Sequence, residues 1–362
     1  MKSLLYFFLV SALASAQQSK SVDFLTCNSS ITFDVKEKRV SGRVAYEFEV
    51  TGKPDTIYLD ARNMQFSDVK INGKKAKWLS SSTKLKLFKG YKKGNNKVEF
   101  NYSAQPKQAL YFVPDGDATQ IWTQGQGKYT SHWLPSFDDV NEKVVFNTEV
   151  TFNSSYEVIA NGQLKSRNDN NGRATWSYQM EEPMSSYLLM LAVGRFDKHQ
   201  EVSASGTPLE FYFRPDDAPK YEPTYRYSRR IFDFLETETG VKYPWKIYRQ
   251  VPVLDFLYAG MENTTSTIFS QDFVVDSIGF NDRTYINVNA HELAHHWFGD
   301  LVTAQSSRHH WLQEGFATYY ALLAERELFG EDHFQHELYD MAERLQQASK
   351  TDTIPVLNEK AS

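Results

Sequence analysis

The sequence predicts a multidomain protein in which an all-β N-terminal domain precedes an α+β domain. Up to about residue 200, apolar and polar residues alternate with a period of two, which is typical of half-buried strands. Beyond that point several segments follow helical spacing instead. We therefore predict a β domain over residues 17–200 and an α+β domain over residues 201–362, after a leader over residues 1–16.

The front half contains many short strands that are separated by turn signals. The alternation and the Asn-Gly pairs between strands favour a sandwich or saddle of antiparallel sheets. The clearest strands contain the apolar positions Ile31, Phe33 and Val35; Val44, Tyr46, Phe48 and Val50; and Val98, Phe100 and Tyr102.

The back half reads as four helices and a strand. A helix is predicted over residues 222–239 and is ended by Gly240. Residues 249–256 suit a strand, and residues 285–298, 310–329 and 333–348 suit three further helices.

Charge and targeting signals narrow the class of protein. The net charge is −5 and basic residues form only short clusters, which argues against a nucleic-acid partner. Lys2, the apolar residues 4–10 and the small residues Ala14 and Ala16 form a signal-peptide pattern, which predicts export to a periplasmic, extracellular or cell-surface location. The apolar run is shorter than the roughly 20 residues of a membrane span, so we expect none in the mature chain.

One motif carries chemistry. Residues 291–295 read H-E-L-A-H. On a helix, positions i and i+4 share a face, so His291 and His295 can bind the same metal ion. Glu292 then lies beside the metal, where it can act as general base on a zinc-bound water that attacks the peptide carbonyl.

A catalytic zinc ion needs a third protein ligand, and Glu314 on the next predicted helix is the candidate. The alternative motif with a third histidine fails, because position 298 is Phe and position 301 is Leu. We interpret His296, His309 and His310 as surface or supporting residues. The expected cofactor is one Zn²⁺ ion, although cobalt or manganese can occupy such a site in vitro.

The sequence around these ligands resembles the aminopeptidase N and leukotriene hydrolase family of zinc metallopeptidases. The resemblance rests on the segments 291–303 and 311–317, which contain H-E-x-x-H and a glutamate after eighteen intervening residues. Three further segments are similar to family motifs. Residues 259–263 resemble the G-x-M-E-N motif, residues 123–126 resemble the T-Q-x-[EQ] segment, and residues 186–196 resemble a strand that begins S-Y-L. The resemblance implies a thermolysin-like fold for the α+β domain.

The resemblance also implies substrate-binding residues. It assigns Gly260, Met261, Glu262 and Asn263 to the exopeptidase motif, and it makes Glu262 and Gln126 the groups that bind the free α-amino group of a peptide. A carboxylate and an amide oxygen can both accept hydrogen bonds from an ammonium group. The expected activity is therefore removal of the N-terminal residue from peptides.

The chain departs from the family at its C-terminal end. The family uses an oxyanion-stabilising tyrosine and a helical domain that lie beyond the point matching Ser362, so we expect the thermolysin-like domain to be incomplete. Losing an oxyanion donor typically lowers the rate about 10²–10³-fold. The alternatives are a zinc-binding chain with little activity and a thermolysin-like endopeptidase. A non-catalytic scaffold and an epoxide hydrolase activity also remain open.

Overall fold

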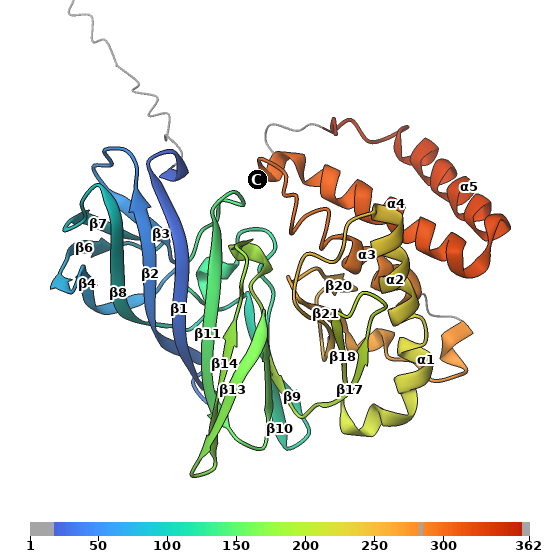
Figure 1. The fold of residues 1–362 in the computed structure, drawn as a ribbon, viewed down its shortest axis with the longest axis horizontal. Helices are drawn as coiled ribbons and strands as arrows, with labels where there is room; N and C mark the ends of the chain where they lie inside the picture. The colour runs from blue at the N-terminus through green and yellow to red at the C-terminus, as the bar shows by residue number, and fades with distance from the viewer. Residues whose placement is uncertain (1–17, 282–284, 357–362) are drawn as a thin grey trace, which may run out of the picture.

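The computed structural model describes residues 18–281 and 285–356. The predicted leader, residues 1–16, lies outside the described residues. Figure 1 shows the strands of the N-terminal half on one side and the helices on the other. The expected order of an all-β part before an α+β part is therefore confirmed.

A nine-stranded sheet dominates the N-terminal part, and its strand order is β13-β14-β11-β1-β2-β8-β4-β5, with β15 paired to β11. The pairing of β1 with β11 is parallel, so the sheet is mixed and not purely antiparallel as expected. A long connection separates these two strands, and parallel pairing requires such a crossover. The strands are β1 (Val22–Asp34), β2 (Arg39–Val50), β4 (Gln65–Ile71), β5 (Lys74–Lys75), β8 (Gly94–Ala104), β11 (Lys143–Asn153), β13 (Gln163–Asn170), β14 (Arg173–Gln179) and β15 (Met184–Ser185).

Two smaller sheets complete this part, with strand orders β3-β7-β6 and β12-β16-β10-β9. Their strands are β3 (Ile57–Asp60), β6 (Lys77–Ser80), β7 (Lys84–Lys89), β9 (Leu110–Asp115), β10 (Ala118–Thr123), β12 (Glu157–Ala160) and β16 (Leu191–Gly194). The predicted alternation is confirmed in β2, where the apolar positions are buried and the residues between them are more exposed.

The second part is built on a five-stranded sheet of order β17-β18-β19-β21-β20. Its strands are β17 (Asp197–Val202), β18 (Pro208–Phe213), β19 (Tyr248–Val253), β20 (Gly260–Met261) and β21 (Ser266–Ser270). The boundary drawn at residue 200 falls inside β17, because this sheet begins at Asp197.

Among the described residues, five α-helices lie in the second part. The helix expected over residues 222–239 is divided into α1 and α2, and Gly240 ends it in a left-handed conformation with φ of 65°. The helices are α1 (Tyr221–Tyr225), α2 (Ser228–Thr239), α3 (Tyr285–Ala294), α4 (His310–Phe329) and α5 (Glu331–Ala348). Short 3₁₀ helices are Gln18–Lys20, Thr130–His132, Ser186–Leu188, Pro215–Lys220, Gln271–Phe273, Gly279–Asn281 and Ser307–His309. Among the described helices, none combines the length and the apolar composition that crossing a bilayer requires.

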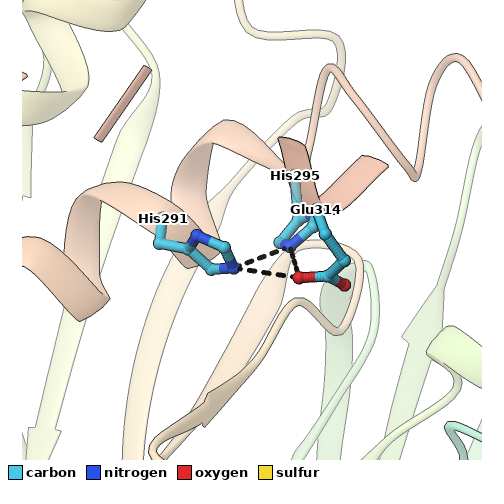
Figure 2. Close-up of side chains that lie close together, drawn as sticks. All are labelled: His291, His295 and Glu314. Atoms are coloured by element: carbon cyan, nitrogen blue, oxygen red, sulfur yellow. Dashed lines mark hydrogen bonds and ion pairs between the residues drawn. The ribbon is translucent and has the colours of Figure 1, made fainter. Parts of the chain in front are cut away.

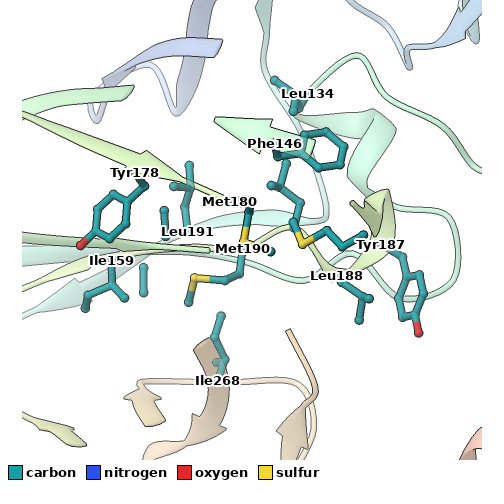
Figure 3. Packing of buried hydrophobic residues seen from close by; sticks show 14 of the residues in the cluster. Leu134, Phe146, Ile159, Tyr178, Met180, Tyr187, Leu188, Met190, Leu191 and Ile268 are labelled. Atoms are coloured by element: carbon teal, nitrogen blue, oxygen red, sulfur yellow. The ribbon is translucent and has the colours of Figure 1, made fainter. Parts of the chain in front are cut away.

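One hydrophobic cluster runs through both parts of the molecule. Figure 3 shows Met190 of the N-terminal part next to Ile268 of β21, and both side chains are buried. Burying aliphatic and thioether side chains contributes roughly 1.5–3 kcal/mol each. The two parts therefore share a core, and the N-terminal part forms a wall of the site described next.

Candidate functional site

The three predicted ligands meet between α3 and α4 (Figure 2). The Nε2 atoms of His291 and His295 lie 3.1 Å apart. Oε2 of Glu314 lies 3.4 Å from Nε2 of His291 and 3.7 Å from Nε2 of His295. Tetrahedral zinc ligands at about 2.0–2.2 Å from the metal would be separated by roughly 3.3–3.6 Å, so the donor set fits one such ion.

The helix that carries the histidines ends sooner than predicted. α3 ends at Ala294, whereas residues 285–298 were expected to be helical. His296 and Trp297 donate to carbonyls three residues back, which tightens the chain after the helix. The backbone N–H of His295 still bonds to the carbonyl of His291, so both imidazoles keep the i, i+4 relationship that the motif requires.

The second nitrogen of each imidazole also has a partner. Nδ1 of His295 lies 3.1 Å from the carbonyl oxygen of Phe298, and Nδ1 of His291 lies 3.4 Å from Oγ1 of Thr318. Such contacts orient metal-binding histidines. Sequence reasoning did not identify Thr318, although its position one helical turn after Glu314 on α4 was an available signal.

The electrostatics of the cluster favour a cation. Burial alone would lower the pKa of His295, but the carboxylates of Glu262, Glu314 and Glu292 together raise it to about 10. Burial would likewise raise the pKa of Glu314, yet its histidine neighbours hold it well below the usual range. A site that holds positive charge so strongly suits a divalent ion bound by two histidines and a carboxylate.

Glu292 lies on α3 against Gly260. Its side chain is buried, and burial raises its pKa well above the ordinary range. A Cβ atom on Gly260 would lie 2.5 Å from Cγ and 2.6 Å from Oε1 of Glu292. The absence of a side chain at Gly260 therefore allows the carboxylate to lie beside the loop.

A cavity of about 400 Å³ unites most of the predicted site. Glu262 is only 2% exposed, and its Oε1 has no hydrogen-bond partner among the described residues. Gln126 lines the cavity, and its side-chain nitrogen lies 3.1 Å from Nε2 of His310. The predicted residues that line it are Gln126, Gly260, Glu262, His291, Glu292, His295 and Glu314.

Two predicted substrate-binding residues lie elsewhere. Met261 and Asn263 are buried and do not line this cavity. The sulfur of Met261 accepts from Nε2 of Gln124, and the amide of Asn263 donates to the carbonyl of Leu188. Met261 and Asn263 therefore contact the interior of the protein, where they stabilise the loop that carries them.

A second cavity of about 530 Å³ shares Gln126 and Glu314 with the first. Tyr187 lines it, and its hydroxyl accepts from Nε2 of Gln313 at 3.1 Å. Sequence reasoning noted Tyr187 only as part of a motif. The cleft around His291, His295 and Glu314 therefore extends along the N-terminal part.

The remaining nearby histidines are not in the ligand group. His296 is fully buried, and its Nδ1 contacts the hydroxyl of Tyr243 at 2.8 Å. His310 contacts Glu314 from one turn earlier on α4, with Nε2 at 2.9 Å from Oε1. His309 ends the 3₁₀ helix that precedes α4.

Comparison with known families agrees with this arrangement. The peptidase M1 N-terminal domain matches residues 26–188, and the peptidase family M1 domain matches residues 224–360. The chain belongs to peptidase family M1. Its two matched regions correspond to the strand-rich part and to the part that carries His291, His295 and Glu314.

Several curated relatives of this M1 chain are aminopeptidases. Leucyl aminopeptidase of Saccharolobus solfataricus is 26% identical over 288 residues, which cover 78% of this chain and 37% of the relative. Leucine aminopeptidase 2 of Yarrowia lipolytica is 28% identical over 327 residues, or 85% of this chain and 47% of the relative. Glutamyl aminopeptidase of Rattus norvegicus is 30% identical over 196 residues, which cover 52% of this chain and 21% of the relative. The matched regions span less than half the length of these relatives.

Proposed function

We propose that this M1 chain carries the zinc site and the amine-binding groups of an aminopeptidase. The observation that carries the proposal is the meeting of His291, His295 and Glu314 with Glu262 and Gln126 around one cavity. A bound Zn²⁺ ion would polarise the scissile carbonyl and acidify a water molecule.

The chain's own residues supply the remaining roles. Glu292 is the general base: its buried carboxylate takes a proton from water and passes it to the departing amine. Glu262 anchors the substrate, since its Oε1, which has no partner among residues 18–281 and 285–356, can accept a hydrogen bond from an ammonium group. Gln126 contributes a second contact from the N-terminal part. Holding the ammonium here places only the first peptide bond beside Glu292.

An exopeptidase and an endopeptidase make different use of Glu262. A blocked N-terminus has no ammonium to offset the burial of this carboxylate, so N-acetylated peptides should bind poorly. An endopeptidase does not bind a free N-terminus and therefore does not need the carboxylate of Glu262. The buried acid in the cavity therefore favours the aminopeptidase. We further propose that the protein is exported, on the basis of the leader pattern in residues 1–16, and that its partners are peptides with a free N-terminus.

The test compares leucine p-nitroanilide with its N-acetyl derivative as substrates of the zinc-loaded chain. We expect hydrolysis of the free amine only, and loss of that preference in Glu262→Ala. Cleavage of N-acetylated peptides at internal peptide bonds would instead indicate an endopeptidase. Zinc binding without any hydrolysis would favour a metal-binding chain that is weakly active or inactive.

A further inference from the structure

The loop that follows Glu262 is strained. Thr265 has a φ of 69°, in the left-handed region that β-branched residues rarely adopt. Such a conformation costs about 1–3 kcal/mol and persists only where the surroundings hold it. Thr265 is also buried, so its contacts with the rest of the protein must provide that support.

A turn of the N-terminal part provides it. Asn161 and Gly162 connect β12 to β13. The side-chain amide of Asn161 donates to the carbonyl of Thr264 at 2.7 Å, and the backbone N–H of Gly162 donates to Oγ1 of Thr265 at 2.7 Å. Two successive residues of the turn therefore hold two successive residues of the loop.

Asn161 is held in turn by its own surroundings. Its amide also donates to the carbonyl of Leu188 at 3.1 Å, and its Oδ1 accepts from the backbone N–H of Met190 at 2.7 Å. The amide of Asn263 reaches the same carbonyl of Leu188 at 3.2 Å. A buried side chain with both donors and its acceptor satisfied has one orientation available.

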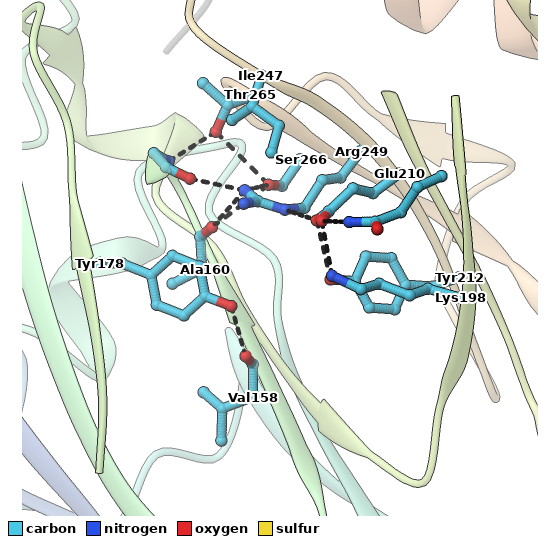
Figure 4. A network of polar contacts seen from close by, with 12 residues as sticks. Val158, Ala160, Tyr178, Lys198, Glu210, Tyr212, Ile247, Arg249, Thr265 and Ser266 are labelled. Carbon is cyan, nitrogen blue, oxygen red and sulfur yellow. Dashed lines mark hydrogen bonds and ion pairs between the residues drawn. The ribbon is translucent and has the colours of Figure 1, made fainter. Parts of the chain in front are cut away.

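The other side of the turn is fixed by a buried ion pair (Figure 4). The guanidinium of Arg249 donates to the carbonyl of Gly162 at 2.6 Å and to Oε2 of Glu210 at 2.7 Å. The backbone N–H of Arg249 donates to the carbonyl of Thr265. Gly162 itself has a φ of 82°, and a Cβ there would overlap the carbonyl of Gln179, so only glycine fits this turn.

We propose that Asn161 is a positioning residue for recognition of the free amine. It acts through the loop, because it fixes Thr264 and thereby the backbone that carries Glu262. A side-chain hydrogen bond joins Glu262 to Tyr187, whereas Oε1 of Glu262 has no partner among the described residues, so the position of this oxygen depends on the backbone that carries it. This inference rests on the proposed function, in which Glu262 binds the substrate ammonium.

The variant Asn161→Ala tests the proposal, and Asn96→Ala is its matched control. Asn96 is also buried, and its side chain makes comparable bonds to Lys92 and Gly94 at the start of β8. Neither side chain is a metal ligand, so zinc affinity should stay unchanged in both variants. Both should lose thermal stability, which makes stability alone uninformative.

Three measurements separate positioning from a structural role: hydrogen exchange in residues 262–266, the dissociation constant of leucinamide against that of N-acetyl-leucinamide, and KM against kcat for leucine p-nitroanilide. For Asn161→Ala we expect faster exchange in the loop. A displaced anchor typically weakens binding about ten- to a hundred-fold, so leucinamide affinity should fall and KM should rise by that factor, with a smaller change in kcat. Asn96→Ala should leave all three at wild-type values.

Two results contradict the inference in distinguishable ways. If Asn161→Ala keeps wild-type exchange and wild-type preference for leucinamide, Asn161 is only structural and the proposed function stands. If the wild-type chain binds leucinamide and its N-acetyl derivative equally, the role of Glu262 in amine recognition fails, and the positioning role of Asn161 fails with it.

Discussion

Nε2 of His310 lies 2.9 Å from Oε1 of Glu314, one turn away on the same helix. The other carboxylate oxygen, Oε2, faces His291 and His295. This hydrogen bond to Glu314 raises the pKa of His310, against the opposing effect of burial. The contact therefore fixes Glu314 with its other oxygen directed toward His291 and His295.

Removing that contact should weaken metal binding. We expect His310→Leu to lower zinc affinity about 10–100-fold, the usual effect of losing a residue that orients a ligand. Chelator competition measures the change. His309→Leu is the control: among the described residues, the histidines that pair with Glu314 are His291, His295 and His310, so this variant should bind zinc as the wild type does. Equal affinities in the two variants would show that Glu314 needs no such support.

A methyl group at position 260 should displace the proposed general base. In Gly260→Ala the new Cβ would lie 2.5 Å from Cγ of Glu292, so either the loop or the carboxylate must move. A displacement of about 1 Å typically costs about 10²-fold in rate, and we expect kcat to fall by that order with zinc affinity intact. Gly279→Ala is the control, since its Cβ would make only ordinary contacts from 3.5 Å. A wild-type kcat in Gly260→Ala would argue against Glu292 as the base.

Zinc should stabilise the fold. An ion that binds only the native state at a hundred times its dissociation constant adds about 2.7 kcal/mol. Thermal unfolding of the chelated and the zinc-loaded chain measures this difference. Glu314→Gln should strongly reduce the shift in unfolding temperature between the chelated and the zinc-loaded chain, because an amide is a poorer ligand than a carboxylate. A shift of unchanged size in that variant would place the stabilising ion at another site.

Glu142 should make stability depend on pH. Burial raises the pKa of this carboxyl to about 7, although its Oε1 accepts a hydrogen bond from the backbone N–H of Phe24. The folded state therefore favours the neutral acid, and the stability linked to this group is present below the ordinary pKa near 4.5 and lost as pH rises through 7. The free energy of unfolding, measured by urea denaturation, should fall less between pH 5 and pH 8 in Glu142→Gln than in the wild type. The exposed Glu47→Gln should keep the wild-type profile.

Much of the second part could be predicted from local patterns. The helix α4 was expected with the same ends that it has, and α5 differs only at its start. The end of α3 was predicted too late, because the turns after Ala294 depend on contacts around His295 and Phe298. The parallel pairing of β1 with β11 was missed for a related reason: alternation identifies a strand but not its neighbour.

The sequence alone determined the metal-binding motif, because the i, i+4 spacing of His291 and His295 is a property of a single helix. Only the tertiary structure decided that Asn263 faces Leu188 and that Asn161 holds the loop after Glu262. These two contacts join residues that are 75 and 103 positions apart in the sequence. Their geometry is set by how the two parts pack around a common core, and no local periodicity encodes that packing.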